Sequence, residues 1–180
     1  MVADPRAQAL WRSLRFLQLD EYIDPPPGTE SFRSALARQL FDPIGVRAED
    51  RGSILDPADP AEGARMDRLV AAGPLALALL GLGANGHIAF NEPGDRGRGY
   101  HVVELSAATV AANFPGAGAG ARVRALTIGL DQLLRTRKLI LWVPQREKQP
   151  LLERVLGGAA EDLPACRLLE HPALTVYRVR

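Results

Sequence analysis

The hydrophobic residues of this chain follow two different spacings along the sequence. Some lie in short apolar runs, such as Leu-Ile-Leu-Trp-Val at residues 139–143, which are typical of buried β-strands. Others recur every three or four positions, as Phe32, Leu36 and Leu40 do, which is the spacing of one helical face. The pattern predicts strands over residues 14–19, 75–80, 101–105, 139–143 and 174–179, and helices over residues 31–41, 61–72, 106–113, 130–134 and 148–156.

Strands that alternate with helices over short connections predict an α/β fold with a mostly parallel sheet flanked by helices. The run over residues 75–80 is apolar throughout, so we expect it to be a central strand of that sheet, buried on both of its faces. The run over residues 14–19 is expected to be a second buried strand that stops at Asp20. A length of 180 residues fits one domain, so we expect a single domain over residues 1–180.

Composition and charge narrow the classes of function. Lys+Arg 22 and Asp+Glu 21 leave a net charge of +1, without the excess of positive charge that is typical of proteins that bind nucleic acids or membrane surfaces. The single cysteine, Cys166, excludes an internal disulfide and a zinc site built from several thiolates. Asp4, Arg6 and Arg12 stand where a signal peptide has its apolar core. We therefore expect a cytoplasmic protein that binds neither nucleic acid nor membrane.

The densest group of chemically useful residues lies in a glycine-rich segment directly after the predicted central strand. Its glycines allow the backbone to come close to a ligand. Asn85, His87 and Glu92 fall within eight residues there. An imidazole exchanges protons near neutral pH, and a nearby carboxylate fixes its tautomer and stabilises its protonated form. The spacing also fits a simpler alternative, in which His87 bonds a loop carbonyl and Glu92 is solvated.

Further candidates stand at the ends of predicted strands. Asp20 and Glu21 follow the run over residues 14–19, and ligands of α/β folds bind beyond the carboxyl ends of the strands. Partial burial in such a place raises the pKa of a carboxyl group, which suits a general base. Lys148 follows the run over residues 139–143, where a cation is placed to meet an anionic ligand group. For the two acids and the lysine, a solvated loop residue is the alternative.

Residues 80–94 read Leu-Gly-Leu-Gly-Ala-Asn-Gly-His-Ile-Ala-Phe-Asn-Glu-Pro-Gly. This segment resembles the signature of glucosamine-6-phosphate deaminases, also called isomerases, which share a superfamily with 6-phosphogluconolactonases. The lactonases resemble it as far as Gly-His and lack the continuation Ile-x-Phe-Asn-Glu-Pro. Leu-Asp-Glu-Tyr at residues 19–22, Ala-Leu-Thr-Ile-Gly at residues 125–129 and the segment over residues 163–171 resemble the same family in the same order. The resemblance runs from about Phe16 to the C-terminus.

The resemblance implies a Rossmann-like fold and a role for each matching residue. Asp20 falls on the family's base, which moves a proton between C2 and C1 of the sugar, and His87 falls on the histidine that opens the sugar ring. Glu92 falls on the glutamate that pairs with this histidine, and Lys148 on a lysine that contacts the substrate phosphate. The predicted catalytic residues are Asp20, Asn85, His87 and Glu92, and the predicted substrate-binding residues are Glu21, Gly83, Gly86, Thr127 and Lys148.

The implied reaction converts glucosamine 6-phosphate to fructose 6-phosphate and ammonia and uses no metal or other cofactor. A small sugar phosphate is the expected partner. The sequence allows a homo-oligomer but does not decide the oligomeric state. Two alternatives remain. One is a relative that binds a sugar without turning it over, and the other is a hydrolase of the 6-phosphogluconolactonase type.

Two departures from the family pattern concern the phosphate. The family begins with a strand-helix unit that carries a Gly-Gly phosphate loop, and the 19 residues before Asp20 hold no counterpart, so we expect this unit to be missing. Thr109-Val110 stands where the family often has Thr-Arg, with the arginine on the phosphate. Because each charge-assisted hydrogen bond contributes ~1.5–3 kcal/mol, we expect a weaker hold on a phosphosugar or a different sugar.

Overall fold

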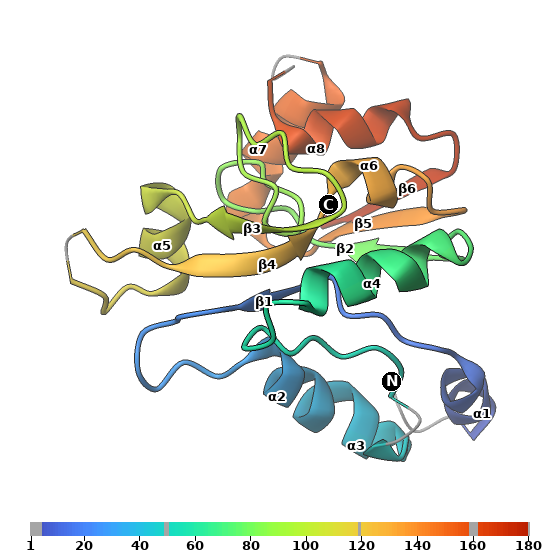
Figure 1. Ribbon diagram of the computed structural model, residues 1–180. Coiled ribbons are helices and arrows are strands. Elements are labelled where there is room, and N and C mark those ends of the chain that lie inside the picture. The colour runs from blue at the N-terminus through green and yellow to red at the C-terminus, as the bar shows by residue number, and fades with distance from the viewer. Residues whose placement is uncertain (1–4, 49–50, 119, 159–161, 180) are drawn as a thin grey trace.

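Two three-stranded sheets form the centre of the structure (Figure 1). The computed structural model describes residues 5–48, 51–118, 120–158 and 162–179. The strands are β1 (Asp20–Tyr22), β2 (Ala78–Leu80), β3 (Tyr100–Glu104), β4 (Arg124–Ile128), β5 (Leu139–Val143) and β6 (Leu174–Arg178). The helices are α1 (Pro5–Ser13), α2 (Phe32–Leu36), the π-helical η1 (Ala37–Phe41), α3 (Asp42–Ile44), α4 (Glu62–Ala71), α5 (Ala107–Asn113), α6 (Leu130–Leu133), the 3₁₀ turn η3 (Arg146–Lys148), α7 (Gln149–Leu156), α8 (Pro164–Arg167) and the 3₁₀ turn η4 (Leu168–Glu170).

One sheet is parallel and the other is antiparallel. In the parallel sheet β5 lies between β2 and β6, and in the antiparallel sheet β4 lies between β1 and β3. The predicted α/β class with a parallel sheet is confirmed. The antiparallel sheet was not predicted, because four of the five residues of its central strand β4 are buried and the run therefore shows no alternation of polar and apolar positions.

The strand predicted over residues 14–19 is wrong in position. Within this run only Leu17 makes a β-bridge, to Ser53, and the strand β1 starts at Asp20. Asp20 is paired with Thr127 of β4 in antiparallel register. The acid therefore belongs to the strand itself rather than to a loop beyond the end of a parallel strand.

The strand predicted over residues 75–80 exists, but its predicted burial on both faces is wrong. β2 is an edge strand of the parallel sheet, and Leu79 is 57% exposed. Leu79 pairs with Ile140, and Trp142 on the same face of β5 pairs with Tyr177 of β6. Trp142 is 52% exposed and Tyr177 55% exposed, so one face of the sheet is open over all three of its strands.

The predicted helices form close to their expected bounds. Ser31 caps α2 with its hydroxyl, which accepts from the backbone N–H of Ser34 at 3.1 Å, and Ser106 caps α5 in the same way through Thr109 at 3.2 Å. The helical pattern of residues 31–41 continues through η1 and α3 as far as Ile44. The helix α1 was not predicted.

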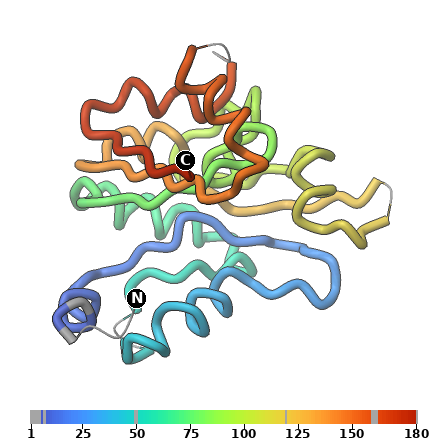
Figure 2. Tube along the Cα trace, turned by 180° about the vertical axis from the view of Figure 1, so that it is seen from behind, coloured from blue at the N-terminus to red at the C-terminus, as the bar shows by residue number. Residues whose placement is uncertain are grey.

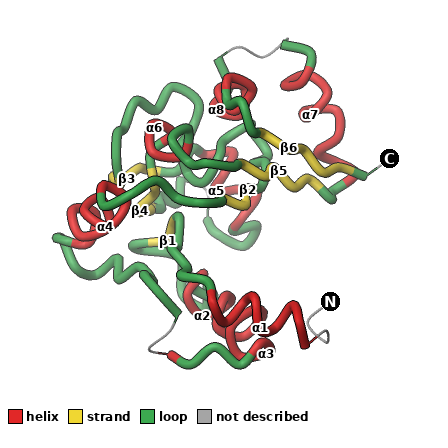
Figure 3. Tube along the Cα trace, turned by 90° about the vertical axis from the view of Figure 1, so that its right-hand side faces the viewer, coloured by secondary structure: helices red, strands yellow, loops and turns green. Residues whose placement is uncertain are grey.

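Three buried clusters among the described residues hold these elements together. The largest joins the parallel sheet to β3, β4, α7 and α8, and it includes Leu82 and Ile88 of the glycine-rich loop. A second cluster, around Tyr22, Phe90 and Phe114, fills the space between β1, that loop and α5. Figures 2 and 3 show the N-terminal segment with α1, α2 and α3 at one end of the molecule and the C-terminal elements at the other. The glycine-rich loop is thus anchored in two cores.

None of the helices in the described residues combines the length and the apolar character that a membrane crossing requires.

Candidate active site

A cavity of about 750 Å³ opens between the end of β2, β1, α5 and the turn η3. Four separated parts of the sequence contribute to its wall. The lining residues are Asp20, Tyr22, Phe32, Gly81, Leu82, Gly83, Ala84, His87, Ala89, Phe90, Thr109, Ala112, Asn113, Glu147, Lys148 and Leu151. Four of the predicted site residues, namely Asp20, Gly83, His87 and Lys148, meet here.

The glycine-rich loop brings its backbone against the catalytic candidate His87. A Cβ atom on Gly83 would lie 2.3 Å from the Cδ2 and Nε2 atoms of His87, so only glycine leaves room for the ring. Gly86 has a φ of +87° and does not line the cavity. It faces Leu163, and its carbonyl accepts the backbone N–H of Ala165 at 3.0 Å. Gly86 therefore shapes the loop and joins it to the start of α8.

Behind His87 lies a network of polar side chains. The Nδ1 atom of His87 is 3.2 Å from the hydroxyl of Thr109 and 3.8 Å from Oε1 of Glu92. The Nδ2 atom of Asn85 donates to Oε2 of Glu92 at 2.6 Å and to the hydroxyl of Ser106 at 3.0 Å. Glu92 is only 6% exposed. Neither Asn85 nor Glu92 lines the cavity, so both lie next to His87 on the side away from the cavity.

The environment raises the pKa of Asp20 and lowers the pKa of His87. Burial, and after it the charge of Glu21, raises the pKa of Asp20 from 3.8 to about 7. Burial lowers the pKa of His87 from 6.5, although the charge of Glu92 opposes this shift, and the charge of Lys148 adds to it. Near neutral pH the cavity thus presents a carboxyl group able to gain or lose a proton and a neutral imidazole.

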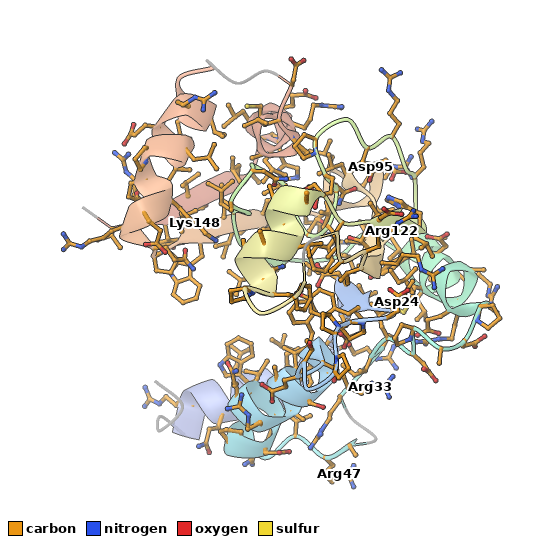
Figure 4. All side chains as sticks on the ribbon, turned by 90° about the vertical axis from the view of Figure 1, so that its left-hand side faces the viewer. Asp24, Arg33, Arg47, Asp95, Arg122 and Lys148 are labelled. Carbon is orange, nitrogen blue, oxygen red and sulfur yellow. The ribbon has the colours of Figure 1, made fainter. Side chains whose placement is uncertain are left out.

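Lys148 is the cationic side chain among the described residues that line the cavity. Its Nζ atom donates to the carbonyl of Leu82 at 2.6 Å, which ties η3 to the glycine-rich loop. Figure 4 shows Lys148 at the side of α7, away from the labelled Arg33 and Arg122. Lys148 thus offers an ammonium group to an anionic ligand, next to the carboxyl group of Glu147 on the same wall.

Glu21, predicted to bind substrate, does not line the cavity. Its buried carboxylate accepts the backbone N–H groups of Tyr22 at 3.0 Å, Phe32 at 3.1 Å and Arg33 at 2.8 Å. It also accepts from the side chain of Gln18 at 3.1 Å. Glu21 therefore joins β1 to the start of α2.

This arrangement predicts a large loss of stability for Glu21→Gln. The amide offers one acceptor oxygen to four donors and points its own donors at N–H groups, so the free energy of unfolding falls by about 2–3 kcal/mol. Thermal unfolding followed by circular dichroism should show a midpoint about 4–12 °C lower. The matched control is Glu104→Gln, because Glu104 is solvent-exposed and pairs with Arg122. Equal midpoints for the two variants would contradict the role assigned to Glu21.

Thr127 is also buried and lies outside the cavity wall. Its hydroxyl accepts the backbone N–H of Phe90 at 3.0 Å, so it fixes the glycine-rich loop to β4. The predicted site residues therefore separate into two groups. Asp20, Gly83, His87 and Lys148 face the cavity, whereas Glu21, Asn85, Gly86, Glu92 and Thr127 hold those residues in place.

Sequence reasoning missed the aromatic wall and the polar groups of α5. The rings of Tyr22, Phe32 and Phe90 pack with centroids 4.7 to 6.0 Å apart and line the cavity. Asn113 donates to the hydroxyl of Tyr22 at 3.2 Å. The Ser-x-x-Thr pattern at residues 106–109 was a usable signal, because it predicts a capped helix start with a second hydroxyl on it.

No group of three or more His, Cys, Asp or Glu side chains in the described ranges is arranged to hold a metal ion. The cavity instead offers the carboxyl groups of Asp20 and Glu147, an imidazole and an ammonium group. This set is suited to acid–base chemistry on a small anionic molecule.

Solved structures share this fold. A 6-phosphogluconolactonase from Leishmania guyanensis superposes with a TM-score of 0.70 at 16% identity over 95% of this chain and 75% of its own. A monomeric glucosamine-6-phosphate deaminase superposes with a TM-score of 0.78 at 31% identity over 90% of this chain and 70% of its own. The fold class is therefore the Rossmann-like fold that these two kinds of enzyme have in common.

The chain belongs to the family described as glucosamine-6-phosphate isomerases/6-phosphogluconolactonase, whose model matches residues 1–176. Among similar sequences, the glucosamine-6-phosphate deaminase of Rhodopirellula baltica is 37% identical over 165 residues, which are 87% of this chain and 66% of that enzyme. The enzyme of the same name from Lysinibacillus sphaericus is 30% identical over 94% of this chain and 75% of its own length. The chain thus spans about two thirds to three quarters of the length of these relatives.

Proposed function

We propose that this chain is a glucosamine-6-phosphate deaminase, which converts glucosamine 6-phosphate and water to fructose 6-phosphate and ammonia. The observation that carries the proposal is the common cavity of Asp20, His87 and Lys148, which come from three separate segments. The names of relatives at 30–37% identity support the same reaction. We further propose that the chain works in the cytoplasm, with residues 1–180 as one domain.

The first step opens the sugar ring. Because Nδ1 of His87 faces Thr109 and Glu92, Nε2 is the nitrogen that is left for the substrate. It accepts the proton of the anomeric hydroxyl and returns it to the ring oxygen, so that the bond between C1 and the ring oxygen breaks. The lowered pKa of His87 keeps its ring neutral, so that Nε2 is free of a second proton and can accept one, and the buried charge of Glu92 stabilises the transient imidazolium.

The second step moves a hydrogen from C2 to C1. Asp20 removes the C2 proton, which the neighbouring carbonyl makes acidic, and an enolamine forms. Asp20 returns a proton to C1, and the nitrogen loses a proton as the oxygen on C1 gains one. Water then adds to the resulting imine at C2, and ammonia leaves. A base with a pKa of about 7 suits a proton that is taken and given back on the same carboxyl group.

Lys148 holds the phosphate in this proposal, so Lys148→Met is expected to raise KM for glucosamine 6-phosphate about 10–100-fold. The turnover number kcat should change little, because the lysine binds a group remote from the reacting carbons. Lys138→Met is the matched control, because Lys138 is exposed and does not line the cavity. If the KM of the Lys148 variant stays within twofold of that of the unmodified chain, Lys148 does not bind the phosphate.

The proposed function is tested by incubating the chain with glucosamine 6-phosphate and measuring ammonia and fructose 6-phosphate in parallel. We expect the two products in equal amounts. Hydrolysis of 6-phosphogluconolactone, together with no release of ammonia from glucosamine 6-phosphate, would instead identify a lactonase. A ligand-induced rise in melting temperature without either turnover would identify a binding protein.

A further inference from the structure

The hydroxyl of Thr109, a residue of the cavity wall, is the nearest polar partner of the histidine ring. It lies 3.2 Å from Nδ1 of His87, whereas the nearest carboxylate oxygen of Glu92 is 3.8 Å away, which is too long for a hydrogen bond. Thr109 is only 1% exposed. The structure therefore places a buried hydroxyl, and not the carboxylate, in direct contact with the inner nitrogen of His87.

This hydroxyl belongs to a connected chain of hydrogen bonds. Ser106 donates to the hydroxyl of Thr109 at 3.1 Å, and Asn85 donates to the hydroxyl of Ser106 at 3.0 Å. Asn85 also donates to Glu92 at 2.6 Å. Thr109 thus links the ring of His87 to the residues that hold Glu92, and its own position is fixed by the first turn of α5.

A hydroxyl in this place suits a histidine that changes its protonation state. It donates to Nδ1 when that nitrogen is bare and accepts from Nδ1 when that nitrogen carries a proton. A carboxylate alone would favour only the protonated ring. The same contact holds the ring plane in both states, so that Nε2 keeps facing the cavity.

We infer that Thr109 is a positioning residue for His87, which holds the ring through Nδ1 in both of its protonation states. The inference rests on the proposed function for its kinetic consequence, because ring opening requires Nε2 to take and return a proton at one place. It does not rest on that function for its structural content, since the contact between the hydroxyl and the ring is measurable without turnover.

The kinetic test compares Thr109→Val with Thr109→Ser. Valine keeps the shape and removes the hydroxyl, so kcat should fall about 10–100-fold with KM within threefold. Serine keeps the hydroxyl and should restore kcat to within about threefold of the unmodified chain. Thr136→Val is the matched control. Thr136 is also a buried threonine, and its hydroxyl has no hydrogen-bond partner in the described part of the chain, so its variant should retain full activity.

The second readout is the pair of ¹⁵N resonances of the His87 ring, followed by NMR as a function of pH. We expect both to move in Thr109→Val and to stay in place in Thr109→Ser and Thr136→Val. An unchanged kcat and unchanged resonances in Thr109→Val would overturn the inference. Equal losses in the valine and serine variants would also overturn it, because the methyl group and its packing would then be responsible. If no variant turns over substrate, the proposed function fails, and the resonances alone decide the inference.

Discussion

Replacing Asp20 by asparagine is expected to lower kcat by about a thousandfold. Asp20 lines the same cavity as His87, and its pKa of about 7 fits a base that must both take and release a proton. General bases contribute roughly 10²–10⁴-fold to rate, and here one base serves two carbons, so the larger part of that range is expected. Asparagine preserves the shape of the side chain and cannot take the proton.

The same substitution is expected to make the folded chain more stable above neutral pH. Because burial raises the pKa of Asp20 above its unfolded value of 3.8, the folded state disfavours the ionised carboxyl group. The associated stability is present below about pH 4 and is lost as the pH rises through about 7. The amide of the variant has no charge to bury, so the difference in stability between variant and parent should grow by about 2–3 kcal/mol between about pH 5 and about pH 8.

Melting curves at these two pH values check the stability effect. The midpoint of Asp20→Asn should exceed that of the parent by about 4–12 °C more at the higher pH than at the lower one. Asp24→Asn is the control, because Asp24 is an exposed acid that pairs with Arg124 and lies outside the cavity wall. Full turnover by Asp20→Asn would show that the carboxyl group is not the base. A midpoint difference that does not change with pH would show that burial does not raise the pKa of Asp20.

The second large effect is expected from Gly83→Ala. The added Cβ would lie 2.3 Å from two atoms of the His87 ring, and the ring must move by about an ångström to accept it. A displacement of that size costs roughly a hundredfold in rate when the displaced group takes part in the chemistry. The backbone of Gly83 has no positive φ, so the substitution acts through the ring and not through strain in the loop.

The control for this variant is Gly73→Ala, since a Cβ there would meet no atom within 4 Å. Both variants should fold, with kcat reduced only in Gly83→Ala. Full activity in Gly83→Ala would mean that the present place of the His87 ring is not the working one.

Much of the fold could be predicted from the sequence because local patterns of apolar residues determine many of its elements. The run Leu139–Val143 and the helical spacing of residues 61–72 are strong, independent signals, and both elements formed as expected. The strand β1 was misplaced by a few residues because its three residues, Asp20, Glu21 and Tyr22, are mostly polar or amphipathic. Its position is set by pairing with β4, which a local pattern does not report.

The candidate site divides in the same way. Residue type and motif pointed to Asp20, His87 and Lys148, and the structure brings all three to one cavity. Their supporting residues depend on long-range contacts, such as that of Thr109 with His87, 22 positions away in the sequence. Glu21 lies beside Asp20 in the sequence, but adjacent side chains of a strand point to opposite faces. The carboxylate of Glu21 therefore accepts N–H groups at the start of α2 and does not line the cavity.

The most direct test of the account follows the hydrogen that moves between the two carbons. Glucosamine 6-phosphate deuterated at C2 is turned over in H₂O, and the C1 position of the fructose 6-phosphate is examined by NMR. One carboxyl group acting from one side of a bound substrate should deliver a single deuterium to only one of the two C1 positions, and Asp20→Asn should abolish this signal. Deuterium spread equally over both C1 positions, or the same labelling by Asp20→Asn, would contradict a proton transfer carried by Asp20.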